Sequence, residues 1–286
     1  MFAQPKPPLL ATALLVLLAQ LSSAHAHPGL DEHIARVTAQ LAAQPQDTSL
    51  LLQRADLHRQ HGQYDAALAD LTTAAHLKPD ATIVTLAQAR VFSDAGRITN
   101  ALASVQQFLA AEPGHPEALV IRARCEFKLN QVALAIADYS LALASPKTSE
   151  PDLWLERARA QAALGQLASA VSGLDEGMAR LGEIPTLQLA AVEYERQRAD
   201  FDAALVRVDK FTARYPVKEP WLVLRGEILA QGGRLAEAKE VFQQTLAGIK
   251  QYPPARLALE QTIQLQARAR EGMARVEARL AKKSNS

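Results

Sequence analysis

The feature that most constrains the fold of this chain is a sequence period of 34 residues. At this spacing glycine follows glycine, alanine follows alanine and proline follows proline, at Gly62 and Gly96, Ala67 and Ala101, and Pro79 and Pro113. A fixed period of about 20 to 50 residues is typical of arrays whose units bury their apolar faces only against neighbouring units. The chain is therefore expected to form a stack of similar units around an elongated core.

Six copies of one pattern follow each other in phase. The eighth position is small in five copies, at Ala55, Ala89, Ala123, Ala158 and Gly226, and is Val192 in the other. The twentieth position is alanine in all six: Ala67, Ala101, Ala135, Ala170, Ala204 and Ala238. Between these positions stand Gly62, Gly96, Gly165 and Gly233, replaced in the two degenerate copies by Asn130 and Ala199. Small residues allow helices to approach closely, so the pattern predicts helical hairpins joined by tight turns.

This pattern resembles the tetratricopeptide repeat (TPR), in which each unit is a pair of antiparallel helices. We assign six repeats to residues 48–81, 82–115, 116–149, 151–184, 185–218 and 219–252. The resemblance implies an all-α fold, a right-handed superhelical solenoid with a concave and a convex face. Prolines after Pro45 all fall at repeat junctions or beyond the last repeat, where they cost no helical hydrogen bond. The low aromatic fraction, 5%, agrees with an interior built mainly from Ala, Leu and Val.

Both ends of such an array need a cover for the apolar face of the terminal hairpin. Residues 27–47 are predicted to form an N-terminal capping helix, with four apolar residues at helical spacing: Leu30, Ile34, Val37 and Leu41. Residues 253–286 are predicted to form a C-terminal capping helix and a basic tail. We expect the first half of this helix to cover repeat six and the part beyond about Arg268 to project from the solenoid.

Residues 1–26 have the features of a secretory signal peptide. Lys6 precedes an uncharged apolar run at residues 9–21, and Ala-His-Ala at 24–26 fits the cleavage rule for small residues. The run is shorter than the roughly 20 apolar residues of a membrane span; an uncleaved anchor is the alternative. We therefore expect export and a mature chain that begins at His27, with the periplasm as the favoured destination and secretion as the alternative.

Charge and cysteine content exclude several classes of protein. The formal net charge is +1, and removal of residues 1–26 leaves 30 basic and 30 acidic residues, which argues against nucleic-acid binding. A single cysteine, Cys125, excludes an internal disulfide and any multi-cysteine metal site; a buried small hydrophobe is the favoured role for it. The sequence has no P-loop, no G-x-S-x-G and no H-E-x-x-H motif, so we expect neither an enzyme nor a cofactor.

In the TPR family, ligands usually lie in the concave groove along the first helix of each repeat. Transferring these groove positions to this chain gives the candidate partner-binding residues: Leu52, Asp56, Leu86, Arg90, Val120, Arg124, Phe127, Lys128, Leu155, Arg159, Leu189, Glu193, Arg196, Val223 and Glu227. The fifth position is apolar in every repeat, which predicts an apolar strip along the groove. The ninth position holds three consecutive arginines, at Arg90, Arg124 and Arg159.

Two interpretations of these three arginines remain open. Guanidinium groups form bidentate bonds with carboxylates, so the arginines could hold a peptide that bears carboxylates. Alternatively, they pair with acidic residues of neighbouring helices, such as Glu126 or Glu156. Clamp-type TPR modules grip a terminal carboxylate with lysine and asparagine, so the arginines here do not support a clamp of that type. Another four arginines recur at the seventh position and are expected to be structural: Arg54, Arg122, Arg157 and Arg225.

Three functions are compatible with these patterns. The leading hypothesis is a non-enzymatic scaffold of the periplasm or secreted space that binds a protein or peptide in the concave groove. The second is a structural or assembly component of an envelope machine that engages through its C-terminal helix. The third, and weakest, is metal handling by the exported N-terminus, where the imidazole and α-amino group of His27 would be ligands.

Overall fold

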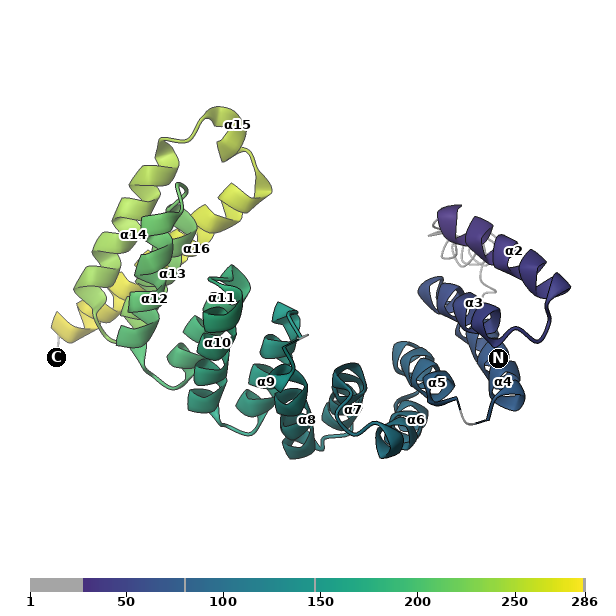
Figure 1. Cartoon of the computed structure of the whole chain (residues 1–286). Helices are drawn as coiled ribbons and strands as arrows, with labels where there is room; N and C mark the ends of the chain where they lie inside the picture. Colours follow the sequence, from purple (N-terminus) through teal and green to yellow (C-terminus); the bar gives the residue numbers. More distant parts are fainter. Residues whose placement is uncertain (1–27, 80, 147, 285–286) are drawn as a thin grey trace, which may run out of the picture. The chain divides into compact units, whose positions relative to one another are not determined.

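The computed structural model describes residues 28–284 except residues 80 and 147 (Figure 1). The predicted signal peptide and His27 lie outside the described residues. Every regular element in the described part of the chain is a helix, as the sequence predicts. The chain divides after Leu129 into two compact units, which we call unit 1 and unit 2 and describe separately.

Unit 1 is a stack of helices in which each helix packs against the next one along the chain (Figure 1). Its helices are α2 (Pro28–Ala43), α3 (Thr48–Gln60), α4 (Tyr64–Leu77), α5 (Thr82–Asp94), α6 (Ile98–Ala111) and α7 (Pro116–Lys128). The first helix of a hairpin also contacts the first helix of the next, so α5 lies against both α3 and α7. Val37 and Leu41 of α2 are buried in the same core cluster as Leu51 and Leu71. The N-terminal helix therefore closes one end of the unit 1 core.

Unit 2 contains hairpins of the same kind and one additional long helix. Its helices are α8 (Val132–Ala144), α9 (Pro151–Ala163), α10 (Leu167–Leu181), α11 (Pro185–Gln197), α12 (Phe201–Arg214), α13 (Glu219–Gln231), α14 (Leu235–Lys250), α15 (Pro254–Leu257) and α16 (Glu260–Ser284). Trp154 of α9 is fully buried, and its ring packs directly over Gly177 of α10. No helix within the described ranges combines the length and the apolar character needed to cross a membrane.

The turn inside each hairpin uses one residue with positive φ. Four of these residues are glycines, Gly62, Gly96, Gly165 and Gly233, with φ between 71° and 79°. In the two degenerate copies, Asn130 and Ala199 adopt the same conformation, with φ of 61° and 60°. Asparagine tolerates this left-handed region well, whereas alanine pays a steric cost for its Cβ atom. Ala199 therefore keeps the turn geometry of the other repeats, although its backbone conformation is strained.

The seventh-position arginines are structural, which confirms the prediction for three of them. Arg54 of α3 forms two hydrogen bonds with Asp70 of α4, of 2.8 and 2.6 Å. Arg157 is buried beside Trp154, with its guanidinium 4.8 Å from the ring centroid, and pairs with Glu176 at 2.9 Å. In the last hairpins, Arg225 of α13 pairs with Asp209 of α12 at 2.8 Å. These guanidinium groups connect neighbouring helices within each unit.

The predicted projection of the C-terminal helix beyond about Arg268 is wrong, whereas the first half covers repeat six along one face. Leu259, just before α16, and Ile263, in its first turn, are 54% and 50% exposed, but Thr262 is buried and Leu265 packs against the core of repeat six. Ala269 and Val276, in the second half, are 0% and 1% exposed and belong to the core of repeat six. The second half of α16 packs against α14 and α13, just as α5 packs against α4 and α3.

Glycine residues allow the second half of α16 to approach α14 closely. The phenyl ring of Phe242 on α14 is fully buried between Gly226 of α13 and Gly272 of α16. A Cβ atom at either glycine would lie within 3.0 Å of a ring carbon, so only glycine permits this approach. The chain reaches this position through residues 251–259 and the short helix α15, which connect α14 to α16.

Candidate protein-binding surfaces

Unit 1 carries a pocket where α3 and α5, the first helices of successive hairpins, lie side by side. Its volume is about 90 Å³. The apolar part of its lining comes from these two helices and from α4: Leu52, Ala55, Leu71, Ile83, Ala87 and Val91. Ile83 is 48% exposed, so part of this apolar surface is open to a ligand. The hollow is therefore small, and Ile83 supplies the open apolar contact surface at its edge.

Charged side chains on the rim of the unit 1 pocket are paired with one another. Arg59 donates to Asp56 on its own helix at 3.0 and 2.9 Å, and to Asp94 on α5 at 2.6 Å. Arg90 of α5 forms two hydrogen bonds with Glu117 of α7, one of them 2.5 Å from Nη2 to Oε2. Each guanidinium on this rim is therefore neutralised by an acidic residue of unit 1.

The pairing of Arg90 with Glu117 bears on the two interpretations of the ninth-position arginines. Internal pairing, the second interpretation, is correct for Arg90. Arg124 is exposed on α7 of unit 1 and Arg159 is exposed on α9 of unit 2, so they belong to separately described units. A peptide in the unit 1 pocket would have to compete with Glu117 for Arg90.

The predicted apolar strip is wrong as a continuous surface feature. Leu86 and Val120 of unit 1 and Val223 of unit 2 are buried, so three of the six fifth-position side chains are closed to a ligand. Leu52 and Leu155 are half-buried, and Leu189 is exposed. Leu86 is enclosed because α5 has a first helix on both sides, α3 and α7. The open apolar surface of unit 1 is contributed instead by Ile83, at the second position of its repeat.

Unit 2 has a larger pocket, of about 430 Å³, between α11, α13, α14 and α16. Its lining combines groove positions of the last two repeats with the second half of α16: Arg196, Glu227, Ala230, Gln231, Phe242, Gly272, Arg275, Val276 and Arg279. Two predicted groove residues, Arg196 and Glu227, therefore lie in one pocket with the C-terminal helix. The sequence could not reveal this, because the position of α16 depends on the irregular segment 251–259.

Four of the charged groups at the unit 2 pocket are paired. Arg196 donates to Gln231 at 2.9 Å and to Glu193 at 3.1 Å. Glu193, another predicted groove residue, therefore lies at the edge of the pocket. One nitrogen of Arg268 donates to both oxygens of Glu227, each at 3.0 Å. These interactions tie α11 to α13, and α13 to α16.

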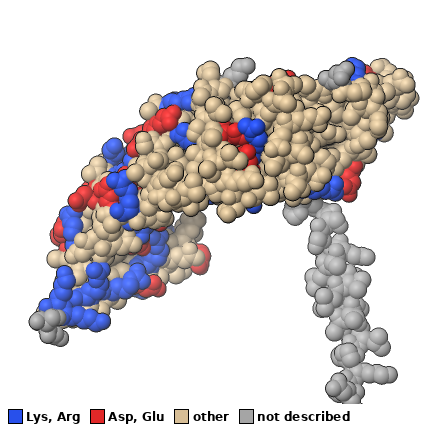
Figure 2. All heavy atoms as spheres, turned by 90° about the horizontal axis from the view of Figure 1, so that it is seen from below, with Lys and Arg blue, Asp and Glu red and all other residues tan. Residues whose placement is uncertain are grey.

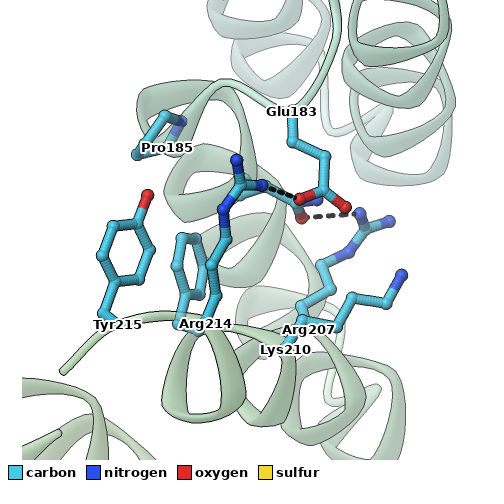
Figure 3. A pocket seen from close by; sticks show the side chains of 8 residues that line it. Glu183, Pro185, Arg207, Lys210, Arg214 and Tyr215 are labelled. Carbon is cyan, nitrogen blue, oxygen red and sulfur yellow. Dashed lines mark hydrogen bonds and ion pairs between the residues drawn. The ribbon is translucent and has the colours of Figure 1, made fainter.

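A third hollow lies beside α12, and sequence reasoning did not identify it (Figure 3). Arg207, Lys210 and Arg214 follow one another at helical spacing along α12, and Figure 3 shows Arg214 directed at Glu183. Arg207 is bound on several sides, by Asp175 at 2.7 and 2.8 Å, by Glu195 at 2.6 Å and by Gln188 at 3.2 Å. Burial raises the pKa of Glu195, and the hydrogen bond from Arg207 opposes this effect. The hollow is thus dominated by an internal network that ties α10, α11 and α12 together.

Cysteine and histidine side chains serve packing and local contacts. Cys125 is 1% exposed and burial raises the pKa of its thiol, which confirms the prediction of a buried small hydrophobe. His58 Nδ1 lies 2.6 Å from the side-chain oxygen of Gln63, and His61 Nε2 lies 3.1 Å from Asp31. Among the described residues, no group of three or more His, Cys, Asp or Glu is placed to hold a metal ion. His27, the metal candidate, lies outside this part of the chain.

These observations define an all-α repeat protein that has open surfaces on its first helices. A family profile described as tetratricopeptide repeat matches residues 52–92, 86–150 and 189–256, which together make up more than half of the chain. The chain belongs to the tetratricopeptide repeat family. No curated protein sequence matches it.

Solved structures of TPR proteins share this fold at low sequence identity. A tetratricopeptide repeat protein from Parabacteroides merdae is 17% identical, with a TM-score of 0.53 over 84% of this chain and 92% of that chain. PilW, described as a widely conserved type IV pilus biogenesis factor, is 21% identical, with a TM-score of 0.56 over 65% and 86%. PilF of Pseudomonas aeruginosa is 15% identical, with a TM-score of 0.52 over 77% and 96%. At these identities the likeness concerns the fold.

Proposed function

We propose that this chain is an exported, non-enzymatic interaction protein that binds a segment of another protein on the first-helix side of its repeats. The observation that carries the proposal is the unit 1 pocket, where Ile83 and Leu52 form an apolar floor beneath a charged rim. An apolar anchor site with a polar rim is the usual arrangement for peptide recognition. Membership of the TPR family supports a scaffold role.

Export to the periplasm forms part of the same proposal. It rests on the signal-peptide pattern of residues 1–26. The fold shared with PilW, described as a pilus biogenesis factor, agrees with a place in the cell envelope. Expression of the whole chain, followed by fractionation and N-terminal sequencing, tests this part. The expected product is a periplasmic protein that begins at His27; an uncleaved cytoplasmic protein would contradict export.

A pull-down with the exported protein tests the binding surface in unit 1. Ile83→Asp places a charge on the apolar floor, and the high exposure of Ile83 leaves the core of unit 1 intact. We expect Ile83→Asp to recover about tenfold less of the partners that the wild type binds. Val206→Asp is the matched control, because Val206 is 61% exposed on α12 and lies outside the three pockets described above. Equal recovery of the same partners by wild type and Ile83→Asp would refute binding at this pocket.

The second candidate, an assembly component of an envelope machine that engages through α16, is favoured by a different observation. Leu259 and Ile263 are large apolar side chains exposed at the start of this helix. Deletion beyond Arg268 is unsuitable as a test, because it would remove Ala269, Gly272 and Val276 from the core. Leu259→Glu combined with Ile263→Glu leaves this core in place. Loss of association in this variant, with retention in Ile83→Asp, would favour the second candidate.

A further inference from the structure

The pocket of unit 2 differs from that of unit 1 because one wall belongs to a helix outside the repeats. The second half of α16 supplies Gly272, Arg275, Val276 and Arg279 to the lining. Ala230 and Gln231 of α13 also belong to the lining, and buried Phe242 of α14 borders it. A ligand in this pocket would touch the groove of the last repeats and the C-terminal helix at the same time.

The arginines on α16 retain capacity for a ligand. Arg279 donates through Nη1 to the backbone carbonyl of Ala230 at 2.6 Å, and no acidic residue in the described part of the chain pairs with it. Arg275 lies 3.7 Å from Glu271, and both side chains are mostly exposed, so this ion pair is weak. Each guanidinium has five N–H donors, most of which remain available.

The charge around this pocket is positive. Helix α16 carries six basic residues, Arg268, Arg270, Arg275, Arg279, Lys282 and Lys283, against Glu260, Glu271 and Glu277. Glu227, the acidic side chain in the pocket lining, is already paired with Arg268. Figure 2 shows that Lys and Arg side chains gather at one end of the visible face, at the lower left, while basic and acidic groups alternate elsewhere.

An acidic peptide segment fits these features better than a lipid surface. Arg275 and Arg279 are one helical turn apart, a spacing at which they can bind two carboxylates of one peptide. Ala230, the partly exposed apolar residue of the lining, can contact an apolar side chain between those carboxylates, whereas Phe242 and Val276 are buried. A flat bilayer would reach the outer basic residues of α16 and would leave the interior of the hollow unused. The volume of about 430 Å³ lies within the range of ligand pockets.

We infer that the pocket between α13 and α16 binds a segment of a partner protein in which two carboxylates flank an apolar side chain. Arg275 and Arg279 bind the carboxylates, and Ala230 contacts the apolar side chain. The inference rests on the proposed function and specifies the partner chemistry for one surface. It also means that the groove and the C-terminal helix, two alternatives at the sequence level, form a single binding site.

Binding of an array of short synthetic peptides to the periplasmically expressed protein tests the chemistry. The array contains peptides with two Asp or Glu around a central Leu, and matched peptides with Asn or Gln in their place. We expect the wild type to prefer the acidic peptides and the Arg275→Gln/Arg279→Gln variant to bind them about tenfold more weakly. Arg270→Gln combined with Lys283→Gln is the control, because it removes the same charge from α16 outside the pocket lining. Equal losses in both variants would refute a specific site.

Two further experiments distinguish binding of an acidic peptide in the pocket from binding of a membrane surface. Gln231→Glu places a negative charge inside the pocket without touching α16, so it should also weaken the acidic peptides. Vesicles of phosphatidylglycerol and phosphatidylcholine serve as the lipid probe. Vesicle binding that depends on Arg275 and Arg279, without any preference among the peptides, would overturn the inference in favour of a membrane surface.

Photo-crosslinking in the cell envelope separates failure of this inference from failure of the proposed function. A photoreactive amino acid is placed at Gln231 in the unit 2 pocket or at Ile83 in the unit 1 pocket. The inference requires crosslinks from Gln231 to a sequence rich in Asp and Glu, identified by mass spectrometry and lost in Arg275→Gln/Arg279→Gln. Crosslinks from Ile83 alone would overturn the inference and leave the proposed function standing. Crosslinks from neither position would overturn both.

Discussion

The pockets of unit 1 and unit 2 are built on the same kind of helix pair but differ in how their arginines are used. In unit 1, Arg59 is held by Asp56 and Asp94, and Arg90 by Glu117. In unit 2, Arg279 donates to a backbone carbonyl and pairs with no acidic residue in the described part of the chain. The difference follows from the origin of the side chains. Arg59 and Arg90 have acidic residues on adjacent repeat helices of unit 1, whereas α16 follows the last repeat helix.

The largest effect is expected from Gly272→Val, which should lower the stability of unit 2 and leave unit 1 unchanged. The new side chain would collide with the ring of Phe242 and force α16 away from α14. Overpacking of this kind costs about 2 to 3 kcal/mol. Urea unfolding measures the loss, and hydrogen exchange shows whether it is confined to α13, α14 and α16. Ala274→Val, at an exposed site of the same helix, should be nearly neutral. Comparable losses in both variants would mean that the contact with Phe242 is unimportant.

Glu117→Gln tests whether internal pairing is what separates the two pockets. The substitution removes the carboxylate that holds Arg90, so the rim of unit 1 gains a free guanidinium. We expect the affinity of unit 1 for acidic peptides to rise by about three- to tenfold, while stability changes by less than about 1 kcal/mol. Glu32→Gln on α2 removes the same charge at an exposed site and serves as the control. Unchanged affinity in Glu117→Gln would indicate that the shape of the unit 1 pocket, and not its charge, limits binding.

The hairpin turns allow a third comparison between the units. Ala199 in unit 2 has a φ of 60°, and Ala199→Gly should relieve its steric strain and stabilise α11 and α12 by about 1 kcal/mol. In unit 1, Gly96 has a φ of 71°, so Gly96→Ala should destabilise α5 and α6 by a similar amount. Hydrogen exchange of peptides that cover each hairpin measures both effects. Changes of the same sign in the two variants would contradict this explanation of the turns.

The smallest expected effect concerns the ionisation of Tyr252, which lies in the connection between α14 and α15 of unit 2. Burial and the hydrogen bond to Glu219, 2.6 Å long, raise the pKa of Tyr252 from 10.0 to about 12. The neutral phenol is thus favoured in the folded protein. Its contribution to stability is complete below pH 10 and is lost as the pH rises toward 12. An absorbance titration should show one late-ionising tyrosine, absent in Tyr252→Phe and shifted to lower pH in Glu219→Gln. A titration unchanged by either substitution would exclude this assignment.

Much of the fold could be predicted from the sequence because the same helix–helix contacts recur in every repeat. Small residues such as Ala67 and Ala101 mark where two helices touch, and both are fully buried. The turn position could be read even where glycine is missing, at Asn130 and Ala199. Periodicity carries this information because helix length and turn length are nearly constant along the array.

The same reasoning fails where the period is interrupted. The part of the last helix beyond Arg268 was expected to project, yet Ala269, Gly272 and Val276 are buried against the core. Close packing against an aromatic ring selects small residues, which a search for large apolar side chains overlooks. The prediction of the candidate site was incomplete for the same reason. The sequence identified Arg196 and Glu227, but Arg275 and Arg279 line the same pocket because of the path that residues 251–259 take.

The position of Phe242 between Gly226 and Gly272 has a consequence for how the C-terminal end of the array opens. Repeat arrays ordinarily fray from their last helix, because each element is held only by its neighbours. Here one ring belongs at once to the interface of α13 with α14 and to that of α14 with α16. Release of α16 exposes the same phenyl group that stabilises the last hairpin, so the three helices should open as one cooperative segment.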